Sequence, residues 1–146
     1  MKKIIATIFI SVFINILFAQ PLSADLILGR WINTNKDLIV ECFKQGDKYF
    51  AKIVWFHVYP NDPNDMVEIP ESTWLNTVVM KDFVFDTNEW NSGTIKNLRN
   101  GKTYTAYIQM GCDNSLIVTG YVGFRFLSST IIFTKYTNAK LPETNK

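Results

Sequence analysis

Three observations predict an all-β fold, a small antiparallel up-and-down β-barrel of about eight strands. Residues 48–57 (KYFAKIVWFH) are rich in aromatic and β-branched residues and contain neither Gly nor Pro, which is the profile of a strand. About eight such segments follow one another with turn signals between them, and none shows the periodicity of a long helix. A two-sheet sandwich would fit the same pattern. We favour a closed barrel because it leaves no sheet edge unpaired.

The strand over residues 48–57 is the centre of this prediction. Its side chains alternate between two faces, one with the odd-numbered residues from Tyr49 to Trp55 and one with the even-numbered residues from Phe50 to Phe56. Both faces are mainly apolar. We therefore expect cover on each side of this strand.

The segment before the first strand predicts an export signal over residues 1–24. Lys2 and Lys3 precede an apolar run that ends near residue 19, and this run is shorter than the ~20 residues of a spanning helix. A small residue at Ala19 or Ala24 suits cleavage, and the sequence leaves the choice between them open. An uncleaved anchor is the alternative that we do not favour.

Removal of the signal leaves one domain, predicted over residues 25–137, of neutral formal charge. The signal holds two of the 15 Lys and Arg residues and none of the 13 Asp and Glu residues, so the formal charge falls from +2 to 0. A neutral domain with scattered cations has no electrostatic footprint for nucleic acid or anionic lipid. We expect a periplasmic or secreted protein with no permanent membrane span after cleavage.

The first half of the domain reads as a meander followed by a long loop. Strands are predicted at residues 26–33, with a bend or close backbone approach at Gly29, at residues 38–44 and at residues 48–57. Residues 58–76 contain three prolines and four acidic residues, so no regular element is expected there. A loop of this length is the one segment able to act as a lid.

The second half supplies the remaining strands, at residues 77–86, 90–98, 103–110, 116–122 and 124–136. The Asn100-Gly101 pair suits a two-residue hairpin turn between two of them. Residues 138–146, with Pro142 and mixed charges, are predicted to be a flexible tail.

Cys42 and Cys112 are the only cysteines, and an oxidising compartment would allow them to pair. In an eight-strand barrel their strands, the second and the sixth, lie on opposite walls. That separation exceeds the ~4.4–6.8 Å between Cα atoms that a disulfide allows. We therefore favour two free thiols over a disulfide.

Several motifs in a fixed order carry a resemblance to a known family. They are Gly29-x-Trp31, Val40-Glu41, Tyr49-x-x-Lys52-Ile53-Val54-Trp55, Trp90-x-x-Gly93-x-Ile95, Asn100-Gly101-Lys102-Thr103-Tyr104 and Leu116-x-Val118-x-Gly120-Tyr121-x-Gly123. This succession resembles the exported bacterial domain-of-unknown-function family numbered 2147. The resemblance implies a small periplasmic or secreted β-barrel and no established activity. The chain departs from the pattern at Ser128-Ser129-Thr130, where the family usually has Gly-Arg-Thr, and at Leu98-Arg99, where it usually has Asp-Pro.

The pair Gly29-x-Trp31 also looks like the start of a lipocalin, in which the Trp plugs the closed end of the barrel. The likeness is one of architecture. It implies a lipocalin-like barrel and nothing more specific.

The sequence offers little to an enzyme. His57 is the only histidine, so a His-rich metal site is excluded, and no nucleophile elbow accompanies it. A hydrolase would need His57 within reach of a nucleophile and of a carboxylate such as Asp62 or Asp65. The acidic residues of the long loop lack the spacing of a calcium site. We predict a non-enzymatic protein without a cofactor or metal.

Aromatic side chains are the most informative remaining feature. Their default role is to fill the barrel, because each buries ~150–250 Å², and we expect a filled interior with any ligand at the open mouth under the long loop. Arg125 is either a surface residue or the one cation available to an anionic ligand. The candidate ligand-binding residues are Trp31, Tyr49, Trp55, His57, Trp90, Tyr104, Tyr121 and Arg125.

Two functions remain. The first is a non-enzymatic cell-envelope protein that binds a small apolar or amphipathic ligand, which requires an apolar pocket of at least ~300 Å³. The second is a structural or protein-interaction module of the envelope, with an exposed apolar patch and a solid interior. The protein partner in that case is unknown.

Overall fold

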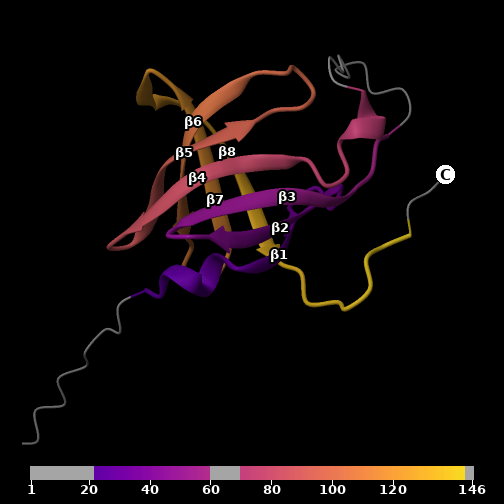
Figure 1. Cartoon of the computed structure of the whole chain (residues 1–146), viewed down its shortest axis with the longest axis horizontal. Coiled ribbons are helices and arrows are strands. Elements are labelled where there is room, and N and C mark those ends of the chain that lie inside the picture. Colours follow the sequence, from indigo (N-terminus) through magenta and orange to yellow (C-terminus); the bar gives the residue numbers. More distant parts are fainter. Residues whose placement is uncertain (1–21, 60–69, 144–146) are drawn as a thin grey trace, which may run out of the picture.

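The computed structural model describes residues 22–59 and 70–143, which form a closed antiparallel barrel (Figure 1). Eight strands follow one another around the barrel in chain order, and β1 (Gly29–Asn33) pairs with β8 (Phe124–Lys135) to close it. This closure confirms the predicted barrel over the sandwich. The other strands are β2 (Leu38–Gln45), β3 (Lys48–Phe56), β4 (Val78–Asp86), β5 (Glu89–Lys96), β6 (Thr103–Met110) and β7 (Leu116–Val122).

The barrel has two unlike ends. The closed end holds the N-terminal 3₁₀ helix η1 (Ala24–Ile27) and the β2–β3, β4–β5 and β6–β7 turns. The mouth holds the β1–β2 turn, the β5–β6 loop and the tip of the β7–β8 hairpin. Because an up-and-down barrel returns every second connection to the same end, these assignments follow directly from the strand order.

Two short 3₁₀ helices correct the sequence prediction. Residues 26 and 27 were expected in the first strand, but they belong to η1, and β1 begins only at Gly29. Gly29 has a φ of 104°, so the predicted bend is present and separates helix from strand. The second helix, η2 (Glu71–Thr73), lies in the segment predicted to hold no regular element. Of the predicted lid, residues 58–76, the central residues 60–69 lie outside the described residues, as does most of the predicted export signal.

The β5–β6 hairpin is present, but its turn differs from the prediction. The strands pair up to Lys96 and Thr103, and Asn97 donates a backbone hydrogen bond to Lys102. The connection therefore spans residues 97–102 and is not a two-residue Asn-Gly turn. Asn97 and Asn100 each accept a hydrogen bond on their side-chain oxygen from a backbone N–H two residues later. These local turns compete with the tight turn that the dipeptide suggests.

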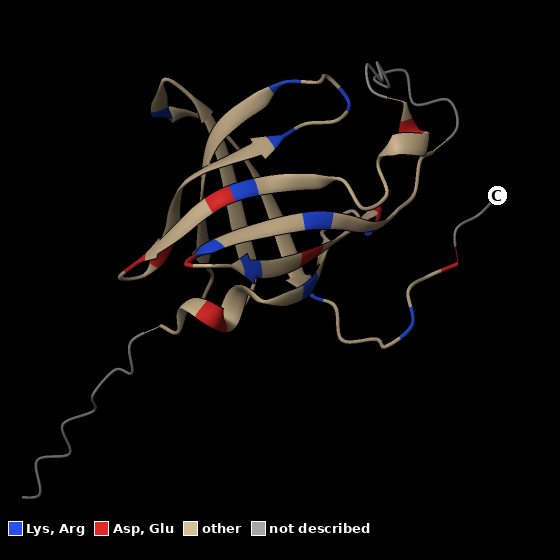
Figure 2. Ribbon diagram, in the orientation of Figure 1, with Lys and Arg blue, Asp and Glu red and all other residues tan. Residues whose placement is uncertain are grey.

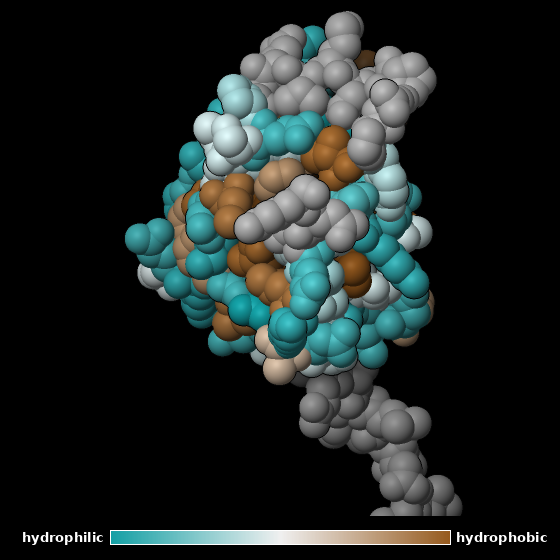
Figure 3. All heavy atoms as spheres, turned by 90° about the vertical axis from the view of Figure 1, so that its right-hand side faces the viewer, coloured by the Kyte–Doolittle hydropathy of each residue, from teal (hydrophilic) through white to brown (hydrophobic). Residues whose placement is uncertain are grey.

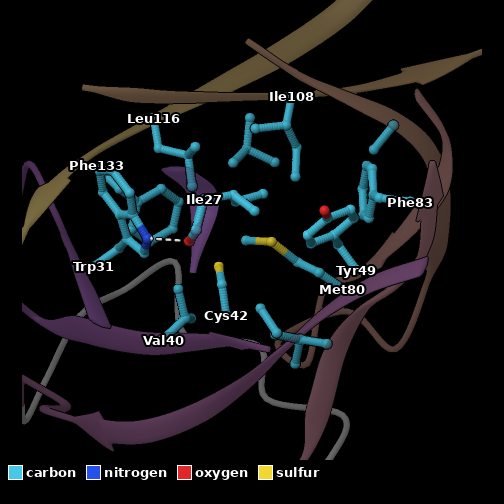
Figure 4. Close-up of a cluster of buried hydrophobic side chains, with 14 of the residues drawn as sticks. Ile27, Trp31, Val40, Cys42, Tyr49, Met80, Phe83, Ile108, Leu116 and Phe133 are labelled. Carbon is cyan, nitrogen blue, oxygen red and sulfur yellow. Dashed lines mark hydrogen bonds between the residues drawn. The ribbon is translucent and has the colours of Figure 1, made fainter. Parts of the chain in front are cut away.

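The interior is packed at the closed end. Trp31, Met80, Phe83 and Phe133 are each at most 2 % exposed, and they lie in one cluster with Ile27 of η1 (Figure 4). On β3, the inner face is buried as predicted, whereas the outer face is only half-buried. The cover expected on both sides of β3 is thus complete on one side only.

Beyond β8 the chain runs on without regular structure. Its first residues are tied to the barrel: Tyr136 donates its backbone N–H to Arg30, and its hydroxyl donates to the carbonyl of Lys140. Arg30 also donates to the carbonyl of Ala139. None of the helices among residues 22–59 and 70–143 is long and apolar enough to cross a membrane.

Candidate ligand-binding site

A cavity of about 1000 Å³ opens at the mouth of the barrel. All eight strands contribute to its wall, because the residues at the mouth half of each strand place every second side chain inside the barrel. Figure 3 faces this end and shows hydrophobic residues gathered in the hollow, inside a more polar rim. The apolar part of the wall includes Val40, Ile53, Val79, Val118, Ile131 and Phe133.

The floor of the cavity is the upper layer of the closed-end core. Met80 and Phe133 line the cavity and are also 2 % and 1 % exposed members of the core cluster. A ligand entering from the mouth would therefore meet a packed apolar floor. The predicted filled interior is correct for the closed end and wrong for the mouth half.

Trp74 stands at the entrance. It follows η2 and is 6 % exposed, with its ring 5.2 Å from that of Phe56. The guanidinium of Arg99, from the β5–β6 loop, lies 6.0 Å from the Trp74 ring, a cation–π distance. One cation and two rings therefore form one side of the entrance.

Polar groups form the rest of the rim. Asn33 fixes the β1–β2 turn: its amide donates to the Asp37 carboxylate at 2.6 Å, and its oxygen accepts from the backbone N–H groups of Asp37 and Leu38. On the opposite side, Asn100 donates to the Tyr104 hydroxyl at 3.1 Å. Lys96, the last residue of β5, and Asn97, the first of the loop that follows, also line the cavity. A polar rim above an apolar wall suits a ligand with one polar end.

Three of the predicted site residues reach this cavity. His57, Tyr104 and Tyr121 line it. The His57 ring lies between two aromatic rings, 6.4 Å from Trp55 and 4.7 Å from Tyr59. The carboxylates Asp62 and Asp65, named for a hydrolase, lie outside the described residues.

Three others lie at the closed end, where they hold η1 in place. The Trp31 indole donates to the carbonyl of Ile27 at 2.7 Å (Figure 4), and the Trp90 indole donates to that of Ala24 at 3.0 Å. The Tyr49 hydroxyl donates to the Asp25 carboxylate at 2.7 Å. These three residues hold η1 at the closed end of the barrel, and none of them lines the cavity at the mouth.

Charges complete the closed end. The Tyr49 hydrogen bond, together with Lys44 at 3.3 Å, lowers the pKa of Asp25. The Lys135 ammonium lies 4.4 Å from the centre of the Trp31 ring, and burial lowers its pKa. A Cβ on Gly29 would lie 3.2 Å from that ammonium nitrogen. The absence of a side chain at Gly29 therefore leaves room for Lys135 over Trp31.

The last two predicted residues lie in or on the barrel wall. Trp55 is 9 % exposed and pairs with Ile39 across β2–β3, and its indole N–H has no hydrogen-bond partner among the described residues. Arg125 donates to Glu89 at 2.9 Å and lies over the Tyr107 ring at 4.0 Å. In this structure Arg125 is thus bound to the outside of the barrel.

Both cysteines are free: Cys42 is buried and Cys112 is exposed. Burial raises the pKa of the Cys42 thiol to about 12, so Cys42 is a protonated core residue at neutral pH. Among the described residues, no three His, Cys, Asp or Glu side chains come together as a metal-binding group.

Sequence reasoning missed several residues of the entrance, above all Trp74, Arg99 and Lys96. Trp74 lies in a segment that was predicted to be a loop without regular structure. The one signal of its burial was the presence of a large aromatic ring among polar residues. The inner wall could have been read from alternation in each strand. The boundary between filled and hollow halves depends on how rings from different strands meet, which alternation does not encode.

The profile of a family described as an uncharacterized protein conserved in bacteria (DUF2147) matches residues 29–135. The chain belongs to this family. The match begins at Gly29 and ends at Lys135, the pair that meets over Trp31, so it spans the whole barrel. No curated protein matches the chain.

A solved structure supports the architecture. The chain is similar to protein HP1028 from Helicobacter pylori, described as belonging to the lipocalin family, with 16 % sequence identity and a TM-score of 0.57. The match covers 77 % of this chain and 84 % of that one. At this identity the likeness concerns the fold, and the lipocalin-like barrel predicted from the sequence is confirmed.

Proposed function

We propose that this protein is an exported, non-enzymatic binding protein that holds a small amphipathic ligand in the cavity at its mouth. The cavity itself carries the proposal: it has about 1000 Å³, against the ~300–1,000 Å³ typical of small-molecule sites. Its wall is apolar and its rim carries Lys96, Asn97 and Arg99. The apolar part of the ligand lies on the floor formed by Met80 and Phe133, and its polar end lies at the rim.

The alternative, a structural or interaction module, required an exposed apolar patch together with a solid interior. The patch exists on the β7–β8 hairpin, but the mouth half of the interior is hollow. We therefore retain ligand binding as the function. The absence of catalysis in the proposal is supported by the setting of His57, whose ring is parallel to that of Trp55 and meets that of Tyr59 edge-on.

The direct test is titration with a fluorescent amphipathic probe, such as a dansylated fatty acid, and with unlabelled competitors. Ser129 lines the cavity on β8, opposite Gly120 of β7. Ser129→Trp places an indole in the cavity. The indole occupies space that the probe would otherwise fill, so the probe buries less apolar area and its affinity should fall at least about tenfold.

Thr134→Trp is the matched control, because Thr134 is exposed on the same strand and does not line the cavity. It should bind the probe as the unchanged protein does. Equal loss in both variants, or no binding of any amphipathic probe, contradicts the proposal. Native mass spectrometry of protein purified from its source would identify the ligand as retained mass.

Export is supported by the N-terminal pattern, and the closed end suggests where cleavage occurs. The Ala24 carbonyl accepts the Trp90 hydrogen bond, and both Leu22 and Ala24 pack against the core. Cleavage after Ala24 would remove these contacts, whereas cleavage after Ala19 keeps them. We therefore expect a mature protein that begins at Gln20. Its intact mass checks this, and a chain beginning at Asp25 would contradict it.

A further inference from the structure

The tip of the β7–β8 hairpin exposes an unusual amount of apolar surface. Phe126 is 79 % exposed, Phe124 66 %, Val122 63 % and Leu127 57 %. The rings of Phe124 and Phe126 stack on each other at 5.5 Å, so they present one continuous surface. We call Val122, Phe124, Phe126 and Leu127 the hairpin patch. The hairpin tip rises at the upper left of Figure 1.

The hairpin is tied to the barrel through the residue between the two rings. Arg125 points away from the patch, donates to Glu89 on β5 and covers the Tyr107 ring on β6. This ion pair lowers the pKa of Glu89. Because the one charge of the tip is neutralised on the barrel side, the outward side is uncharged. The alternation of strand side chains thus separates an anchored face from an apolar face.

The neighbouring loop supplies cations to the same rim. Because β6 pairs with β7, with Thr105 opposite Tyr121, the β5–β6 loop and the hairpin extend from the same end of two neighbouring strands. Both reach the top of Figure 1, the hairpin tip at the left and the loop at the right. Residues 96–102 contain Lys96, Arg99 and Lys102 and no acidic residue, and Figure 2 shows these basic positions on the loop at the top. Exposed aromatic rings and cations along one edge of a protein are the combination that binds the interface of an anionic bilayer.

The patch is also continuous with the cavity. Val122, Phe126 and Leu127 line the cavity as well as facing solvent. We propose that the hairpin patch and the β5–β6 loop dock the mouth of the barrel onto an anionic lipid surface, which places the cavity entrance at the membrane interface. This inference rests on the exposed hairpin and its charged neighbour, so it does not depend on ligand binding in the cavity.

Vesicle co-sedimentation tests the docking, with phosphatidylethanolamine–phosphatidylglycerol vesicles compared with phosphatidylcholine vesicles. Residues 1–19 are omitted because their apolar run would itself bind lipid, so the test uses the proposed mature chain that begins at Gln20. Phe124→Ser combined with Phe126→Ser should reduce binding to anionic vesicles at least about tenfold, since two exposed rings lose their burial in the interface. Leu26→Ser combined with Val84→Ser is the matched control, because those side chains are 48 % and 36 % exposed away from the mouth. It should bind normally.

A second measurement reads the position of the tip without removing it. The four native tryptophans are at most 9 % exposed, so a Phe126→Trp variant adds the one accessible indole. Brominated lipids should quench the fluorescence of the added Trp and leave that of the four native tryptophans unchanged. Lys102→Gln should weaken binding to anionic vesicles about fivefold and leave phosphatidylcholine unaffected, whereas Lys140→Gln in the exposed tail should not.

Three results would overturn the inference. They are an absence of vesicle binding, equal binding by the hairpin and control variants, and an unquenched Trp at residue 126. Dimerisation in solution that depends on Phe124 and Phe126, without vesicle binding, would assign the patch to a second copy of the chain. If docking fails while the amphipathic probe still binds, the proposed function survives and this inference does not.

Discussion

The two ends of the barrel differ in how their interiors are packed. At the closed end, Trp31, Trp90 and Tyr49 each find a hydrogen-bond acceptor on η1, and their rings fill the interior. At the mouth, the interior is hollow, the Trp55 indole N–H has no hydrogen-bond partner within residues 22–59 and 70–143, and Phe124 and Phe126 are exposed. The closed end is stabilised by packing and hydrogen bonds, whereas the mouth leaves apolar side chains around a cavity or exposed to solvent.

Truncation of a ring at the closed end should have the largest effect. Trp90 is fully buried, with Phe85 at 5.0 Å and the Ala24 carbonyl as acceptor. Trp90→Ala should lower the free energy of unfolding by about 3–5 kcal/mol, because it leaves a large cavity. Ile131→Ala at the mouth, where the side chain is 41 % exposed and already borders a cavity, should cost less than about 1 kcal/mol. Urea unfolding measures the free energy of unfolding of both variants. Equal losses would contradict the difference in packing between the two ends.

A smaller effect should follow from adding one methyl group to the packed half. An ideal Cβ on Gly93 of β5 would lie 2.4 Å from the Phe83 ring, which is 1 % exposed and has no room to move. Gly93→Ala should therefore destabilise the protein by about 1–3 kcal/mol. In a Phe83→Ala background the same change should be nearly neutral. Independent, additive losses in the thermal unfolding of the two variants would show that the ring is not the obstacle.

The smallest effect should be on the stability of the fold at low pH. The pKa of Asp25 is lowered in the folded state by the Tyr49 hydroxyl and then by Lys44, so the carboxylate stabilises the fold at neutral pH. That contribution is present above the ordinary pKa of about 3.8 and is lost as the pH falls through the lowered value. Asp25→Asn should therefore flatten the acid side of the stability profile. Tyr49→Phe removes the hydroxyl that mainly lowers the pKa of Asp25, so it should also flatten the acid side of the profile. If the stability of both variants, measured by urea unfolding against pH, keeps the original slope, Asp25 does not contribute to the acid sensitivity of the fold.

The strands were predictable because alternation and turn residues are local signals. The bounds of β6 and β7 match the sequence prediction at both ends, since each lies between clear turns. The start of β1 was wrong because residues 26 and 27 are as apolar in η1 as they would be in a strand. The Asn-Gly turn was wrong because two Asn side chains hydrogen-bond the loop in a longer form. Local composition does not distinguish these outcomes.

The candidate site was predicted only in part. His57, Tyr104 and Tyr121 reach the cavity, while Trp31, Tyr49 and Trp90 fill the opposite end. All six have the same aromatic character in the sequence. Their roles differ because strand position relative to the two ends decides whether a ring meets η1 or the mouth, and a residue's own identity does not contain that information.

The sequence by itself determined that the chain forms a meander of short alternating strands, because the period of apolar residues sets which side chains share a face. Only the tertiary structure decided where the interior is solid and where it is hollow. That outcome depends on η1 entering one end and drawing three polar-tipped rings toward it. It also depends on Arg125 turning back to Glu89, which leaves Phe124 and Phe126 in solvent. Contacts between residues so far apart in the chain exist only once the barrel has closed.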